Sequence, residues 1–147
     1  MSENYSKIVV GTDGSKSSLL AVERAAKIAA AFDATLIIGC AYYENKEEAS
    51  KTLRQDSVTI LGDDPAQENL AKASEVARNA GCTKIENEVR PGTPVEALMG
   101  IVNDRQADLL VVGNRGINSL TGRLLGSVPA DVARQSDCDV MIVHTVS

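Results

Sequence analysis

The segment from Gly113 to Ser127 combines glycines with hydroxyl side chains in a pattern that suits the binding of a phosphate group. Glycines at positions 113, 116, 122 and 126 let the backbone adopt positive φ angles and approach a ligand closely. A helix is expected to begin just after Gly126 and Ser127, and the first N–H groups of a helix have no partners within it. Those N–H groups and the helix dipole attract anions. The segment is therefore a candidate phosphate-binding loop.

A second glycine-containing segment, Gly11 to Ser15, carries an acidic side chain, that of Asp13. A carboxylate does not favour phosphate directly. It can accept hydrogen bonds from ribose hydroxyls or a base amino group, or act through a bound Mg²⁺. A turn between a strand and a helix, capped by Asp or Ser, would have the same sequence. Both interpretations of this segment stay open on the sequence alone.

Groups that would assemble a hydrolytic site are scarce in the sequence. His144 is its only histidine, so no Ser-His-Asp or Cys-His pairing can form near the glycine-rich loops. We expect a structural role for His144 at a sheet edge or a dimer contact. No cluster of histidine and cysteine could hold zinc, and neither a P-loop nor an opening Gly-x-Gly-x-x-Gly is present. We therefore predict binding rather than catalysis, with no metal site built by the protein alone.

The enzymatic alternative is slow chemistry on a bound nucleotide. Asp13 beside bound phosphates could support slow ATP hydrolysis, although nothing supplies the Lys, the water-positioning residue and the arginine finger that fast phosphoryl transfer uses. Self-phosphorylation would have Ser119, Thr121 or Ser127 as candidate acceptors. A third alternative is a structural partner protein with an empty crevice.

Size and charge restrict the class of protein further. The length of 147 residues fits a single domain spanning residues 1–147. The net charge of −5 and the lack of a basic run argue against a nucleic-acid partner. No apolar stretch approaches the roughly 18 residues of a membrane span, and the start of the chain lacks a signal peptide. The chain has three widely spaced cysteines, Cys40, Cys82 and Cys138. Such scattered cysteines indicate thiols in a reducing compartment, so we expect a cytoplasmic protein.

Hydrophobic periodicity predicts strands and helices in strict alternation. The expected strands are 7–10, 35–41, 83–89, 108–112 and 140–145, and the expected helices are 15–32, 64–81, 93–105 and 128–136. Such alternation predicts a three-layer α/β/α fold with a five-stranded parallel sheet, because parallel neighbours need crossover connections. A strand order of 3-2-1-4-5 would place the two glycine-rich loops side by side where ligands bind in such sheets.

Local signals mark where the expected helices begin and end. Two capping boxes are predicted, one at Asp64 with Pro65 and Gln67, the other at Thr93 with Pro94 and Glu96. Gly81 is expected to terminate its helix in a left-handed conformation. The alternation of Ile85, Asn87 and Val89 indicates an edge strand with one water-exposed face, and the segment 42–64 is expected to be a surface excursion.

The spacing of Gly113, two residues, Gly116, nine residues and then Gly126-Ser127 resembles the nucleotide-binding pattern of the universal stress protein family. The segments 9–15, 108–113 and 140–144 also resemble that family's first, fourth and fifth strands, and the resemblance covers essentially the whole chain. It implies a flavodoxin-like domain, similar to adenine nucleotide α-hydrolases, that forms a homodimer through strand five, 140–145. It also implies a stress-response regulator or sensor that binds ATP or a related adenine nucleotide. Some members of the family bind cyclic AMP instead.

The resemblance also implies which residues hold the nucleotide. Thr12 and Asp13 would contact the ribose or adenine, and a Mg²⁺ carried by the nucleotide would lie near Asp13. Cys40 and Val112 would line the base pocket. The complete implied set is Gly11, Thr12, Asp13, Cys40, Val112, Gly113, Arg115, Gly116, Gly126, Ser127 and Val128, of which Gly113, Arg115 and Gly116 would face the phosphates.

Overall fold

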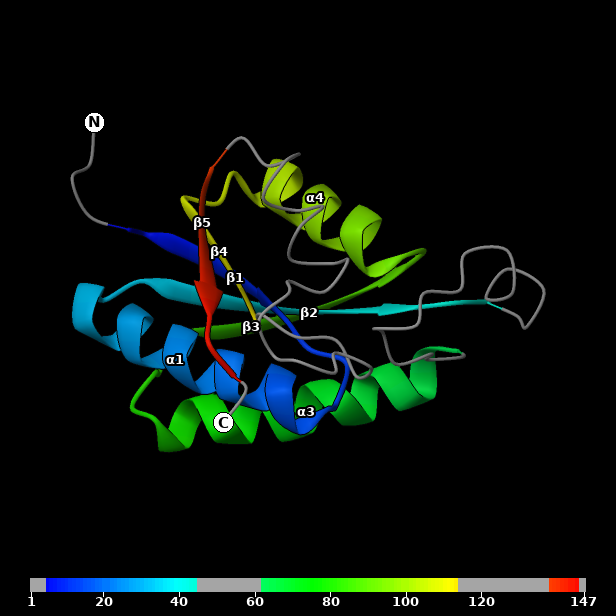
Figure 1. The fold of residues 1–147 in the computed structure, drawn as a ribbon, viewed down its shortest axis with the longest axis horizontal. Coiled ribbons are helices and arrows are strands. Elements are labelled where there is room, and N and C mark those ends of the chain that lie inside the picture. Colours follow the sequence, from blue (N-terminus) through cyan, green and yellow to red (C-terminus); the bar gives the residue numbers. More distant parts are fainter. Residues whose placement is uncertain (1–4, 45–61, 114–137, 146–147) are drawn as a thin grey trace.

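The computed structural model describes residues 5–44, 62–113 and 138–145, and within them it shows a parallel five-stranded sheet (Figure 1). The sheet order is β3-β2-β1-β4-β5, as predicted. Its strands are β1 (Lys7–Gly11), β2 (Thr35–Tyr42), β3 (Ile85–Pro91), β4 (Leu109–Gly113) and β5 (Asp139–Val143), and the described helices are α1 (Lys16–Phe32), α3 (Asp63–Asn79) and α4 (Pro94–Arg105). The predicted helix 128–136 and most of the segment 42–64 lie outside the described residues.

Two hydrophobic clusters cover the two faces of the sheet. Helices α1 and α3 lie on one side, and α4 lies on the other (Figure 1). The inner face of α1 is built largely of fully buried alanines, whose small side chains let the helix pack closely on the strands. Buried strand side chains such as Ile37 and Leu110 face α4. Each fully buried Ile or Leu contributes about 1.5–3 kcal/mol of transfer free energy.

Two glycines, one at the end of β1 and one within β2, bring α4 close to the sheet. A Cβ on Gly11 would lie 3.0 Å from Leu98 Cδ2, and a Cβ on Gly39 would lie 2.6 Å from Ile101 Cδ1. These two side chains of α4 therefore occupy the space that larger residues would fill. The packing places α4 beside the carboxyl end of β1, where the first candidate ligand loop begins.

The predicted capping box is confirmed at α4, and at α1 the structure shows the serine cap that was one of two interpretations of the sequence. Ser15 is the N-cap of α1. At α4, Thr93 Oγ1 accepts from the Glu96 N–H at 3.1 Å, and Glu96 Oε1 accepts from the Thr93 N–H at 3.2 Å, which completes the capping box. Gly81 has a φ of 105°, as its predicted role requires. These features depend on neighbours in sequence, so local patterns could identify them.

The prediction that Asp64 caps α3 is wrong. The N-cap lies two residues earlier, at Gly62, and the helix has no side-chain cap. Gly62 has a φ of 84°, and its N–H donates to the Tyr43 carbonyl at 2.8 Å. That contact fixes the point at which the chain enters the helix. Asp64 therefore lies in the first turn, where a negative charge still complements the helix dipole.

All five strands differ from their predicted bounds by one or two residues, and β3, β4 and β5 differ at both ends. Strand β4 lies one residue later than predicted, and β3 extends to Pro91, where Gly92 N–H donates to the Tyr42 carbonyl at 2.9 Å. A proline is tolerated there because β3 is an edge strand. Strand β5 ends at Val143, so His144 lies beyond the strand and is exposed. The predicted strand 140–145 was too long at this end.

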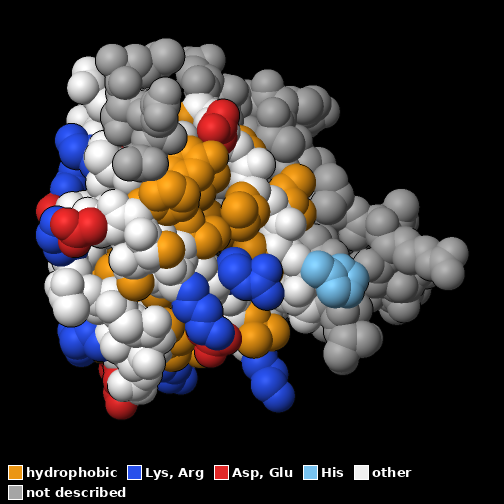
Figure 2. Space-filling view, turned by 90° about the vertical axis from the view of Figure 1, so that its left-hand side faces the viewer, with side chains coloured by type: hydrophobic (Ala, Val, Ile, Leu, Met, Phe, Trp, Pro, Cys, Tyr) orange, Lys and Arg blue, Asp and Glu red, His pale blue; other side chains and the backbone are white. Residues whose placement is uncertain are grey.

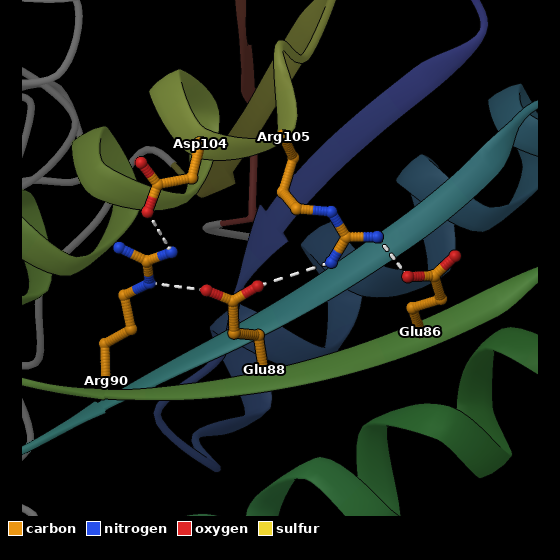
Figure 3. A network of polar contacts seen from close by, with 5 residues as sticks. All are labelled: Glu86, Glu88, Arg90, Asp104 and Arg105. Atoms are coloured by element: carbon orange, nitrogen blue, oxygen red, sulfur yellow. Dashed lines mark hydrogen bonds and ion pairs between the residues drawn. The ribbon is translucent and has the colours of Figure 1, made fainter.

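Charged side chains join the edge strand β3 to α4 (Figure 3). Arg105 of α4 pairs with Glu86 and, at 3.3 Å, with Glu88 of β3. Arg90 of β3 pairs with Glu88 and, at 2.6 Å, with Asp104 of α4. The predicted edge position of this strand is confirmed, but its burial does not alternate as predicted, because Asn87 is exposed and Glu88 and Arg90 are half-buried. Exposed ion pairs contribute about 0–1 kcal/mol each, so the network mainly fixes how α4 lies against the edge strand.

The amino end of the sheet is held by Asp108. Its Oδ2 accepts from the Ser6 hydroxyl at 2.8 Å and from the N–H groups of Ser6 and Lys7 at 2.9 Å each. Burial alone would raise the pKa of Asp108, but these donors outweigh it and lower the pKa below its ordinary value. Nearby, the Tyr5 hydroxyl donates to Asp139 Oδ2 at 2.9 Å. This end of the sheet thus uses its polar groups to hold the first strand in place.

Candidate functional site

The loops after β1 and β4 leave neighbouring strands, as the predicted strand order requires. Val10 of β1 is paired with Val111 of β4, so both strands end at the same edge of the sheet. The second loop leaves the described part of the chain after Gly113. The following predicted site and acceptor residues lie outside it: Arg115, Gly116, Ser119, Thr121, Gly126, Ser127 and Val128.

The first loop is ordered by hydrogen bonds to Thr12, which is only 6% exposed. Its N–H donates to the Gly39 carbonyl at 2.9 Å. Its hydroxyl contacts Ser18 Oγ at 3.0 Å and accepts from the Gly14 N–H at 3.2 Å. The Thr12 side chain thus stabilises the loop itself. Its predicted contact with ribose or adenine stays a prediction.

Asp13 combines a structural bond with capacity for a ligand. Its Oδ1 accepts from the Ser15 N–H at 2.9 Å, and its own N–H donates to Ser18 Oγ at 3.3 Å. The carboxylate therefore does stabilise the turn, which was one of the two interpretations of the sequence. A carboxylate offers several acceptor positions on its two oxygens. The half-buried Asp13 can stabilise the turn and still accept from a hydroxyl or amino group of a ligand.

Ser18 is a site component that the sequence reasoning missed. Its N–H donates to Ser15 Oγ at 3.2 Å, and its hydroxyl donates to the Ser15 carbonyl at 2.9 Å. Together with its bonds to Thr12 and Asp13, it ties the loop to the first turn of α1. The spacing of Ser15 and Ser18 at a predicted helix start is the sequence signal that could have identified it.

Cys40 lies at the end of β2, next to the first loop. Its thiol is 1% exposed, and burial raises its pKa to about 11, with the nearby Asp13 charge adding to the shift and Asn69 opposing it. Asn69, on α3, donates from Nδ2 to Cys40 Sγ at 3.9 Å. A Cβ on Gly14 would lie 2.5 Å from Asn69 Oδ1. The structure therefore brings Asp13, Gly14, Cys40 and Asn69 together.

The two residues predicted to line the base pocket lie on opposite faces of the sheet. Cys40 belongs to the core cluster under α1 and α3, whereas Val112 belongs to the cluster under α4 and is 5% exposed. Side chains of a strand alternate between faces, so a strand position near the crevice does not determine which face a side chain joins. A contact between Val112 and a nucleotide stays a prediction.

Gly113 is enclosed by α1 and the chain beyond β5. A Cβ there would lie 3.2 Å from Ser17 Oγ and 3.4 Å from Thr145 Cγ2. The two hydroxyls, Ser17 Oγ and Thr145 Oγ1, are 2.5 Å apart. A larger residue at position 113 would disturb this contact at the start of the second loop. Gly113 therefore has a packing reason to be glycine as well as its predicted ligand role.

Other kinds of site are not found in the described ranges. No group of His, Cys, Asp and Glu side chains able to hold a metal ion occurs within residues 5–44, 62–113 and 138–145. Over the same ranges, no helix has the length and apolar character needed to traverse a bilayer. None of the three cysteines, all of which lie in the described ranges, forms a disulfide bond. The described half of the site can donate and accept hydrogen bonds and offers one carboxylate, which suits a polar ligand such as a nucleoside.

Comparison with known proteins identifies the family. The family model described as universal stress protein family matches residues 4–144. The universal stress protein Rv1636 of Mycobacterium tuberculosis is 50% identical over 143 residues, which cover 96% of this chain and 97% of that protein. A universal stress protein crystallised in complex with cyclic AMP is 46% identical, with a TM-score of 0.78, and the match covers 98% of this chain and 100% of that one. The crystal structure of Rv1636 has 44% identity and a TM-score of 0.63 over 99% of this chain and 100% of that one.

Proposed function

The chain belongs to the universal stress protein family, and we propose that it is a regulatory or sensor protein that binds an adenine nucleotide between the loops following β1 and β4. The observation that carries this proposal is the adjacency of β1 and β4, which end side by side with glycine-rich sequence after each. Ligands in open parallel sheets bind at this kind of position. Asp13 would accept from the ribose or base, and the second loop would hold the phosphates.

Cyclic AMP and ATP are the two candidate ligands. Cyclic AMP is favoured by the 46%-identical universal stress protein whose crystal structure contains it. ATP is favoured by the glycine spacing of the second loop, in which Gly113, Gly116 and the pair Gly126-Ser127 would hold different parts of one triphosphate, with Arg115 adding positive charge. If ATP binds, its Mg²⁺ would lie near Asp13, whose carboxylate is a suitable oxygen ligand. The residues proposed to hold either nucleotide are those named from the sequence.

Titration calorimetry with cyclic AMP, ATP and ADP, each with and without Mg²⁺, tests the proposal. We expect saturable binding of at least one nucleotide and a rise in melting temperature that grows with its concentration. Asp13→Ala should lower the affinity for the nucleotide. Arg115→Ala should lower the affinity for ATP far more than the affinity for adenosine. If no adenine nucleotide binds or shifts the melting temperature, the proposed function is wrong. Mass spectrometry of any nucleotide that copurifies would identify the ligand.

We propose that the protein acts by binding and not by turnover. The described residues offer hydrogen-bonding groups but no nucleophile paired with a base, and slow ATP hydrolysis or self-phosphorylation stays the alternative. The purified protein incubated with ATP and Mg²⁺ should release no phosphate over multiple turnovers. Phosphate release that is lost in Asp13→Ala would contradict the binding proposal and favour an enzyme.

The proposed assembly is a homodimer of single-domain chains, each spanning residues 1–147, joined through strand five at 140–145. In support of it, β5 is an edge strand of the described sheet, and its central residues Val140, Met141 and Ile142 are only partly buried. Hydrophobic side chains gather on the face of the molecule that Figure 2 shows. Ultracentrifugation should give a dimer, and Ile142→Asp should give a monomer. The free thiols support the proposed cytoplasmic location.

A further inference from the structure

Asn69 lies where the first loop, β2 and α3 meet. Its side chain is half-buried, and its carboxamide oxygen, carbon and nitrogen would lie 2.5, 2.9 and 3.2 Å from a Cβ on Gly14. All three amide atoms thus face the Gly14 backbone. The Nδ2 group also donates to Cys40 Sγ at 3.9 Å. The amide therefore spans the space between the end of β1 and the end of β2.

Only a glycine fits at position 14. Its φ of 83° lies in the left-handed region, and a Cβ at that position would overlap the Asn69 amide. Both the positive φ and the contact with Asn69 therefore require a glycine. Because glycine has no side chain, the Asn69 amide can reach the loop. The result is an amide group placed beside Asp13 and Cys40, two of the residues proposed to contact the nucleoside.

A carboxamide is chemically suited to recognise adenine. It has both a donor and an acceptor, and adenine offers an amino donor beside a ring-nitrogen acceptor, so the two can form paired hydrogen bonds. The ionised carboxylate of an aspartate can only accept. It would lose the bond to the adenine ring nitrogen and would suit the N–H and amino donors of guanine instead. Replacing Asn69 by Asp therefore changes hydrogen-bonding chemistry with little change in shape.

We propose that Asn69 is a specificity-determining residue that makes the site select adenine over guanine. This inference rests on the proposed function, because it assumes that the nucleoside lies against the first loop and the end of β2. The side chain reaches that point from α3, and its contacts with Gly14 and Cys40 hold it at the wall of the proposed base pocket.

The test measures base selectivity in the full chain by titrating cyclic AMP against cyclic GMP and ATP against GTP. Asn69→Asp should weaken binding of the adenine nucleotide by about 5- to 100-fold, the range expected for one paired base contact. It should also narrow or reverse the preference of the site for the adenine nucleotide over the guanine nucleotide. Asn69→Ala should weaken adenine binding without favouring guanine. Ser74→Ala is the matched control, because Ser74 lies on the same helix but donates to Asn87 of β3 at 2.9 Å. Its adenine-to-guanine ratio should equal that of the wild type.

The outcomes separate this inference from the proposed function. If the wild type binds no adenine nucleotide, the proposed function fails. If the wild type binds and both Asn69 variants keep the wild-type ratio of adenine to guanine affinity, the inference fails and the proposed function stands. A purely structural role for Asn69 would lower stability and leave that ratio unchanged.

A measurement on the wild type covers the case in which the variants do not fold. The side-chain amide resonances of Asn69 should move when cyclic AMP or ATP saturates the protein, and should move less with cyclic GMP or GTP. Unchanged Asn69 resonances at saturation with the adenine nucleotide would contradict the inference.

Discussion

The two ends of the sheet each carry an aspartate, and the two carboxylates have different surroundings. At the amino end, Asp108 Oδ2 accepts from Ser6 and Lys7, so the carboxylate joins neighbouring strands. At the carboxyl end, Asp13 accepts from the Ser15 N–H within a turn that also approaches Asn69. At the amino end, Asp108 uses its hydrogen-bond acceptors to hold the fold together. At the carboxyl end, Asp13 orders a loop whose polar groups a ligand can also contact. An aspartate is therefore a structural residue at one end of the sheet and a candidate ligand-binding residue at the other.

Gly14→Val should have the largest effect, and it acts at the carboxyl end. A β-branched residue at a φ of 83° with Asn69 Oδ1 2.5 Å from the new Cβ combines backbone strain with overlap, and should lower the free energy of unfolding by roughly 2–4 kcal/mol. Nucleotide binding should be lost at temperatures where the variant remains folded. Urea unfolding and calorimetry measure the two effects.

Gly62→Val is the control for Gly14→Val. Gly62 has a similar φ of 84°, but a Cβ there would meet nothing within 4 Å among the described neighbours. This variant should be strained and still bind the nucleotide. If both variants lose binding equally, backbone strain alone explains the result, and contact with Asn69 has no separate importance.

Asp108→Ala and Asp13→Ala should produce opposite pairs of effects. Loss of Asp108 leaves three donors without their acceptor and should lower the free energy of unfolding by roughly 1–3 kcal/mol, with nucleotide affinity unchanged. Asp13→Ala should cost roughly 1 kcal/mol or less of stability, yet weaken nucleotide binding. Chemical denaturation and calorimetry on both proteins make the comparison. Equal loss of affinity in the two variants would remove the proposed difference between the two ends.

Sequence patterns predicted this fold well because its determinants are local or follow from strand alternation. The capping box of Thr93 and Glu96 involves a single helical turn, and the parallel pairing follows from the crossover connections that alternating strands and helices require. The strand order itself was implied by the family resemblance. The start of α3 was missed because a contact between Gly62 and Tyr43 sets it, across a segment whose sequence gave no clear pattern.

The candidate site was less predictable than the fold. Asp13 was identified because it is acidic and follows a strand. Asn69 was missed because it comes from the middle of α3, and only the folded chain brings it to Gly14 and Cys40. The opposite faces of Cys40 and Val112 depend on the register of each strand, which spacing relative to a loop does not reveal.

The amino end should also show a specific acid sensitivity. The pKa of Asp108 is lower in the folded protein than its ordinary value, so its stabilisation is present above that ordinary value and is lost as the pH falls through the folded-state value. The stability difference between wild type and Asp108→Asn should be constant from pH 7 to about pH 5 and should shrink below about pH 4. Thermal unfolding across this range is the measurement. A difference that persists at pH 2 would show that the charge of Asp108 is not what stabilises this end.

A small effect is expected from Arg105→Ala, which acts where α4 meets the edge strand β3. Removing its pairs with Glu86 and Glu88 should lower the free energy of unfolding by about 0.5–1 kcal/mol, less at high salt, with no change in nucleotide affinity. Lys27→Ala, which breaks the exposed pair with Glu23, should cost less. Weaker nucleotide binding by Arg105→Ala would show that the position of α4 affects the site through Leu98 and Gly11.

Amide chemical shifts recorded during a titration with cyclic AMP, and separately with ATP, test most directly whether the nucleotide binds at the carboxyl end of the sheet. The amides of Thr12, Asp13, Gly14, Cys40 and Gly113 should shift and saturate together, and those of Ser6, Lys7 and Asp108 should stay in place. Saturating shifts confined to the amino end, or no saturating shifts with either nucleotide, would contradict the proposed site.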